Sequence, residues 1–154
     1  MEHFAHSLHL HPMMVHFPIA LFLGALGFEI VSLILPAKGG AAAGRTKDSL
    51  HRTAFYLYMV AALLSPVVVQ TGLWEEDWHH LHHPVVEAHE RFALITMWTA
   101  LASLPIFWLI QKKNSKIFRK VFIIFALLVA VTVSTAAYYG GHMVYDYGIG
   151  PEEQ

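Results

Sequence analysis

The chain has 154 residues, of which 56% are hydrophobic and only 14% are charged. Charged residues make up about a quarter of a typical soluble domain, so this composition argues against a water-soluble protein. The chain also has no cysteine, which excludes disulfides, thiolate metal sites, iron–sulfur clusters and haem attached through Cys-x-x-Cys-His.

Four apolar stretches dominate the sequence, and each approaches the roughly 20 residues that cross a bilayer core as a helix. They predict one domain over residues 1–154, an all-α, integral membrane four-helix bundle. The predicted spans cover about residues 15–35, 53–73, 87–110 and 119–141.

The cations are divided unequally between the two sides of these spans. Nine of the ten Lys and Arg residues lie in or beside the connections between spans one and two and between spans three and four. The positive-inside rule places those connections in the cytoplasm and both termini outside, an N-out, C-out topology.

The first span opens with the segment HPMMVHFPIA at residues 11–20, which places His11 and His16 at its outer mouth. Small residues follow His16 at helical spacing: Ala20, Gly24 and Gly27. Such a stripe admits a neighbouring helix closely, which is the commoner use, or makes room for a flat macrocycle.

Glu29 lies 13 residues beyond His16, so about 20 Å deeper along a helix. An ionisable group inside a membrane usually faces protein or water. We expect Glu29 to be neutral, or paired with Arg52 or with a hydroxyl of Tyr56 or Tyr58. Proton or quinone chemistry is the functional alternative.

The exterior connection between spans two and three is rich in histidine and acid. An alternative metal cluster here comprises His79, His80, His82 and His83, which follow three acidic residues. Imidazole and carboxylate are ordinary zinc ligands. An incidental, solvated cluster explains the pattern equally well.

Spans three and four each carry a polar stripe. His89, Thr96 and Ser103 are seven residues apart, which predicts one helix face that points into the bundle. In span four the stripe ends at His142, and Gly140-Gly141 is expected to end the helix.

Eleven of the twelve histidines fall on the exterior side in this topology. We expect His16 and His89 to bind one haem b, with His11 and His142 as the next candidates and a second haem if both pairs form. Haem sites of this kind occur in helix-bundle cores. Arg91 would pair with the propionates, and Gly24 and Gly27 would line the slot. Zinc or copper is the alternative cofactor.

Five features stand out together: the start HPMMVHFPIAL, Glu29, Gly72 followed by Asp77-Trp78, His89, and the ending GGHMVYDYGIG. In this combination the chain resembles, over nearly its whole length, a bacterial family of small four-helix predicted membrane proteins defined as a domain of unknown function. The resemblance implies a multi-pass protein of the bacterial inner membrane and no particular activity. With the predicted topology, the histidine-rich side faces the periplasm.

The functional expectation is a small b-type cytochrome that exchanges electrons with quinol, an external cytochrome or other subunits of a membrane complex. A histidine-based zinc or copper protein and an accessory structural subunit are the alternatives. A stand-alone enzyme and a nucleic-acid-binding protein are disfavoured, and the lipid bilayer is the expected surrounding. Because His51 is the only histidine on the inner side, the chain should not carry electrons across the membrane alone.

Overall fold

The computed structural model describes residues 10–36, 40–79, 83–111 and 115–149, and the regular secondary structure in these ranges is entirely α-helical. The helices are α2 (Leu10–Met14), α3 (His16–Ile34), α4 (Gly40–His79), α5 (Pro84–Gln111) and α6 (Ser115–Tyr145). The predicted all-α class is confirmed.

Within the described residues, four helices are long and apolar enough to cross a membrane, as the sequence predicted. Two of them run further than the apolar stretches indicated. Helix α4 begins at Gly40 rather than near residue 53, because the alanines at 41–43 favour helix without being strongly apolar. Helix α6 continues to Tyr145, so the expectation that Gly140-Gly141 would end it is wrong.

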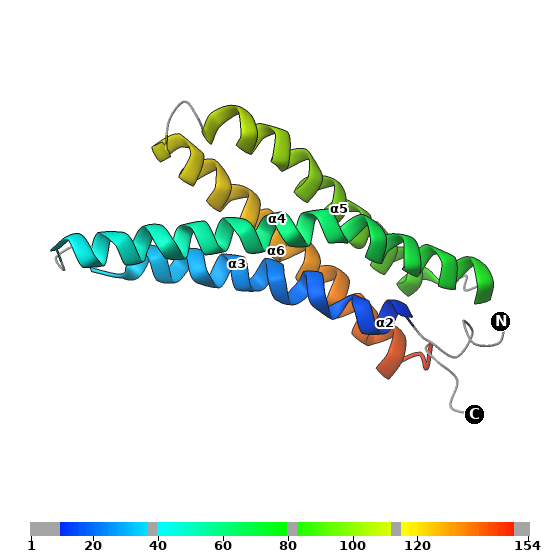
Figure 1. The fold of residues 1–154 in the computed structure, drawn as a ribbon. Coiled ribbons are helices and arrows are strands. Elements are labelled where there is room, and N and C mark those ends of the chain that lie inside the picture. The colour runs from blue at the N-terminus through cyan, green and yellow to red at the C-terminus, as the bar shows by residue number, and fades with distance from the viewer. Residues whose placement is uncertain (1–9, 37–39, 80–82, 112–114, 150–154) are drawn as a thin grey trace.

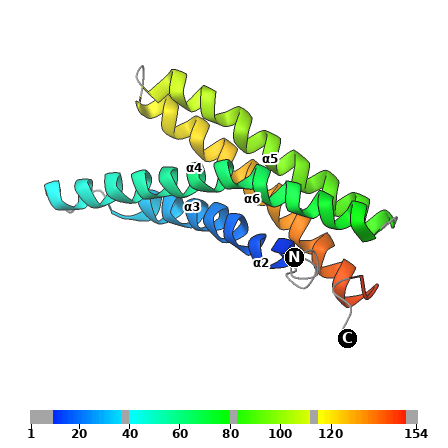
Figure 2. The ribbon, with the colours of Figure 1, turned by 45° about the vertical axis from the view of Figure 1, so that its right-hand side comes forward.

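The helices form two antiparallel hairpins that lie across one another (Figure 1). The first hairpin consists of α2, α3 and α4, and the second consists of α5 and α6. Contacts between hairpins run from α3 to α6 and from α4 to α5. We call the end where α3 begins and α6 ends the histidine end, and the opposite end the basic end. The hairpins diverge towards the basic end (Figures 1 and 2).

A layer of aromatic side chains joins the two hairpins near the middle of the bundle. Phe22 and Tyr58 come from the first hairpin, Phe107 and Phe122 come from the second, and all four are almost fully buried. The Tyr58 ring contacts the other three edge-to-face, with centroids 5.4 to 5.6 Å apart, a favoured geometry for aromatic pairs. The Tyr58 hydroxyl also lies 3.0 Å from Ser103 Oγ in α5.

The predicted polar stripe on α5 does face the interior. Thr96 and Ser103 are buried, and their hydroxyls donate to the carbonyls of Phe92 and Ala100 at 2.7 Å. These bonds to the preceding turn satisfy groups that would otherwise be costly inside a membrane. The stripe begins at His89, which lies at the histidine end.

Candidate functional site

A small cavity lies between the hairpins at the histidine end, with a volume of about 50 Å³. Two histidines line it, His11 from the first hairpin and His89 from the second. Its accessible walls are apolar, because the hydroxyls of the lining residues Ser65 and Thr96 bond to the carbonyls of Ala62 and Phe92 within their own helices. The volume is enough for an ion or a few water molecules, since one water needs roughly 10–15 Å³ measured in this way.

His11 is anchored to α4 of its own hairpin. Its Nδ1 lies 3.0 Å from the carbonyl oxygen of Val68 and 3.3 Å from the Thr71 hydroxyl. A carbonyl oxygen only accepts, so Nδ1 carries the proton and Nε2 holds the lone pair of a neutral ring. The ring rests on Gly72, where a Cβ would lie only 2.7 Å from His11 Cε1.

His89 is anchored in the same way to α6, the other helix of the second hairpin. Its Nδ1 donates to the carbonyl of Ala136 at 2.8 Å, which again leaves the lone pair on Nε2. A Cβ at Gly140 would lie 3.2 Å from this Nδ1. Glycine at Gly72 and Gly140 thus allows both imidazoles to lie close against a helix backbone.

The two rings meet across the hairpin boundary, with centroids 6.1 Å apart and planes 85° apart. Histidines that bind metals commonly donate their second N–H to a backbone carbonyl, which fixes the tautomer and the ring orientation. Two imidazoles that share one metal at about 2.0–2.1 Å per nitrogen have ring centroids roughly 6 Å apart. The centroid separation of this pair therefore matches that of two imidazoles that share one metal, and it equally describes an edge-to-face ring contact.

The structure brings His11 to His89, in place of the expected His16, whose side chain is exposed. His11 and His16 are five residues apart, so on a nearly continuous helix their side chains point about 140° apart and cannot share one face. Helix α2 leads into α3 with helical geometry at Val15, which keeps this relation.

The residues on the buried face of α2 and α3 instead recur every three or four positions, beginning at His11. It carries Val15, Pro18, Phe22, Ala25, Glu29 and Ser32. The expected slot lies off this face. Gly27 is exposed and a Cβ there would meet nothing within 4 Å, whereas a Cβ at Gly24 would contact Leu57 of α4.

The remaining candidates at the histidine end do not line this cavity. His142 forms an ion pair with Asp146 one turn later, and its ring contacts Tyr138. Arg91 is exposed, so the structure gives no support for its expected role with propionates.

Most of the alternative metal cluster cannot be placed. His80 and His82, and the side chain of His79, lie outside the part that the structure describes. His83 Nδ1 accepts the backbone N–H of Val85 at 3.2 Å, and its ring contacts Tyr147. Among the described side chains, no group of three or more His, Asp and Glu is arranged to hold a metal ion.

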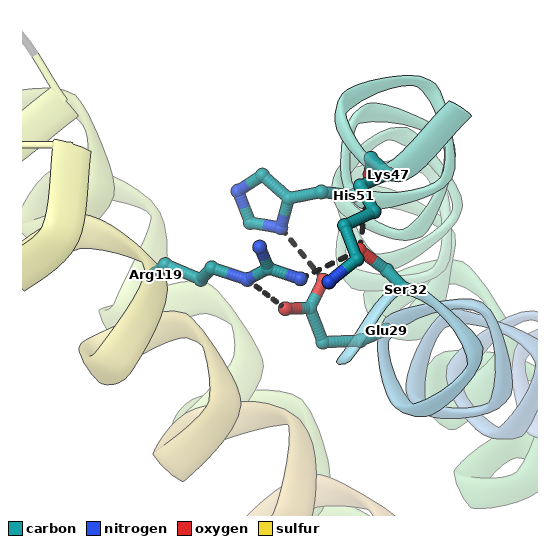
Figure 3. A network of polar contacts seen from close by, with 5 residues as sticks. All are labelled: Glu29, Ser32, Lys47, His51 and Arg119. Carbon is teal, nitrogen blue, oxygen red and sulfur yellow. Dashed lines mark hydrogen bonds and ion pairs between the residues drawn. The ribbon is translucent and has the colours of Figure 1, made fainter. Parts of the chain in front are cut away.

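A second buried polar cluster lies towards the basic end (Figure 3). Glu29 is 1% exposed, and its carboxylate accepts from His51 Nδ1 at 2.6 Å and from Arg119 Nε at 2.7 Å. Arg119 Nη2 also donates to Ser32 Oγ, at 2.6 Å. We call Glu29, Ser32, His51 and Arg119 the Glu29 cluster.

The expected partners of Glu29 were wrong, because its carboxylate pairs with His51 and Arg119. Arg52 and Tyr56 are exposed, and Tyr58 pairs with Ser103 instead. His51 precedes Tyr58 by two helical turns and therefore shares its buried face. That spacing was the available signal for His51, whereas nothing in the spacing identifies Arg119.

Comparison with protein families finds one match over residues 7–153, described as a predicted membrane protein (DUF2231). No curated protein and no solved structure matches the chain. The match spans almost the whole sequence and confirms the resemblance seen in its end motifs. The chain belongs to the DUF2231 family of predicted membrane proteins.

Proposed function

We propose that His11 and His89 are the axial ligands of one haem b and that the protein is a small b-type cytochrome of the membrane. The observation that carries this proposal is the pair of imidazoles from opposite hairpins. Each has its Nδ1–H on a backbone carbonyl, and the ring centroids are 6.1 Å apart.

The number of donors favours haem over a zinc ion. Structural zinc takes four protein ligands, and catalytic zinc takes three. Haem iron brings four ligands with its porphyrin and needs only two axial groups from the protein. Two histidines are what this cavity offers among its lining residues.

The residues of the chain would hold and shield the cofactor. The carbonyls of Val68 and Ala136 would orient the rings, and the apolar walls of the cavity would surround the cofactor. When bound, haem b supplies one-electron transfer. The Glu29 cluster lies about 27 Å from His11 along the helix and includes one histidine, so it offers no second two-histidine site.

The side of the membrane follows from the cations around the basic end. We place the basic end in the cytoplasm and the histidine end at the periplasmic face of a bacterial inner membrane. A cofactor at this face would exchange electrons with quinol, a neighbouring subunit or an external cytochrome.

One observation favours a second candidate, a single copper or zinc ion. The cavity of about 50 Å³ is large enough for an ion, whereas a porphyrin is larger than this volume and requires the helices around the two rings to make room for it. A two-histidine site without further protein ligands would leave the remaining positions to water or to a partner.

The absorption spectrum of the purified protein, together with its metal content, separates these candidates. Haem b gives a Soret band, with α and β bands after dithionite reduction. Stoichiometric copper or zinc without these bands would support the ion instead. Protein with neither group, after expression with ample haem and metals, would contradict both and leave an accessory structural role.

A further inference from the structure

The two histidines are each fixed to their own hairpin. His11 bonds to Val68 and Thr71 of α4, and His89 bonds to Ala136 of α6. The rings of His11 and His89 contact each other across the hairpin boundary, with centroids 6.1 Å apart. The gap between the rings is therefore set by how the first hairpin sits against the second.

The Glu29 cluster spans the same boundary towards the other end. Glu29 and His51 belong to the first hairpin, and Arg119 belongs to the second (Figure 3). Each carboxylate oxygen accepts one short bond, one from within its hairpin and one from across the boundary. Charge-assisted bonds of this kind are stronger and more directional than neutral ones.

The aromatic layer lies between these two clusters. Tyr58 contacts Phe107 and Phe122 there across the boundary, and Phe22 packs against Tyr58 within the first hairpin. Each hairpin is a pair of long helices that pack closely against each other, although proline lies inside α4 at Pro66 and inside α5 at Pro105. We expect a hairpin held at this layer to transmit a change at one end to the other.

We propose that Glu29 and Arg119 are positioning residues whose ion pair sets the angle between the hairpins and, through it, the separation of His11 and His89. The pair joins the hairpins on the side of the basic end, the end towards which they diverge (Figures 1 and 2). The effect on a bound cofactor rests on the proposed function, whereas the effect on hairpin geometry does not.

The absence of cysteine allows this geometry to be measured directly with paired spin labels. At the histidine end, labels at Gln70→Cys and Ser134→Cys report on α4 and α6. Towards the basic end, labels at Ser49→Cys and Ile124→Cys report on the same two helices. All four positions are exposed. Pulsed electron paramagnetic resonance then gives both distance distributions in lipid nanodiscs.

Arg119→Gln removes the charge that crosses the boundary. We expect the mean distance at the Ser49/Ile124 pair to increase, and the distribution at the Gln70/Ser134 pair to shift or broaden. Lys120→Gln is the matched control, because it removes a neighbouring exposed cation from the same helix, and it should leave both distributions unchanged. If Arg119→Gln does not fold, Arg119→Lys should give a smaller change of the same kind. Lysine keeps the charge, but its single ammonium group cannot reproduce the two bonds that the planar guanidinium makes to Glu29 and Ser32.

A folded Arg119→Gln or Arg119→Lys protein with unchanged distances at both ends would overturn the proposal. So would a change confined to the pair near the basic end. A response at both ends in protein that binds neither haem nor metal would uphold the positioning role while refuting the proposed function. In protein that binds haem, the variant should also shift the reduction potential, which a merely stabilising contact would not move.

Discussion

His11 and His89 lie edge-to-face at 6.1 Å, although one begins the first hairpin and the other begins the second. Each ring is held by a carbonyl of a helix that is not its own, Val68 in α4 for His11 and Ala136 in α6 for His89. Four helices thus cooperate to place two imidazoles. His142, by contrast, forms its ion pair with Asp146, four residues later in the chain and just beyond α6.

The glycines beneath the rings give the first prediction. Gly72→Ala would place a Cβ 2.7 Å from His11 Cε1, so the ring must move and cofactor occupancy should fall. Gly141→Ala is the matched control, because a Cβ there meets nothing within 4 Å. It should retain the cofactor and gain about 0.5–1 kcal/mol from the better helix propensity of alanine. Cofactor content and thermal unfolding in detergent measure both effects, and equal occupancy in the two variants would contradict the prediction.

The two partners of the hydrogen bond between Tyr58 and Ser103 should differ in how much stability is lost when each is mutated. Ser103 already donates its proton to Ala100, so the Tyr58 hydroxyl must be the donor to Ser103. Ser103→Ala leaves that buried hydroxyl without an acceptor and should cost about 1–3 kcal/mol, whereas Tyr58→Phe should cost about 1 kcal/mol or less. Unfolding free energies of the two single variants test this order, and the reverse order would contradict it.

Arg119 should matter far more to stability than Arg52. Removing one partner of a buried ion pair leaves the other charge uncompensated, and Arg119→Ala should cost about 3 kcal/mol, the lower end of the usual range because Arg119 is partly exposed. Arg52 is exposed, so Arg52→Ala should change stability by less than about 0.5 kcal/mol. Comparable losses in the two variants would show that the Glu29–Arg119 pair is not the stabilising contact.

The topology can be tested with single cysteines in intact cells, since the chain has none of its own. Tyr147→Cys lies exposed just beyond α6, and Asp48→Cys lies exposed towards the basic end of α4. A membrane-impermeant thiol reagent should label position 147 directly and position 48 only after permeabilisation. The opposite pattern would reverse the proposed orientation.

The sequence was sufficient to predict the helical class, the four spans and the inward face of α5, because apolar length and polar periodicity are local properties. It also identified His89 and Glu29 as interior residues. The sequence favoured His16 over His11 as the partner of His89, whereas the structure places His11 beside His89 and leaves His16 exposed. The position of Glu29 was the better guide to the buried face of this helix. His11 lies on the same face as Glu29, and His16 does not.

Other features depend on which helices meet, and that is not a local property. Arg119 reaches Glu29 across the hairpin boundary, and no spacing within one helix indicates this pairing. The same holds for Gly72 and Gly140, whose role becomes clear only when His11 and His89 are found against them.

The central claim is tested most directly by the reduced-minus-oxidised absorption spectra of three matched alanine variants beside the unaltered protein. His11→Ala and His89→Ala should each lose the haem bands or shift them markedly, because each removes one axial ligand. His16→Ala, which alters an exposed histidine five residues from His11, should keep the spectrum of the unaltered protein. Full retention of the bands in both His11→Ala and His89→Ala, or their loss only in His16→Ala, would contradict the assignment of this pair as the haem ligands.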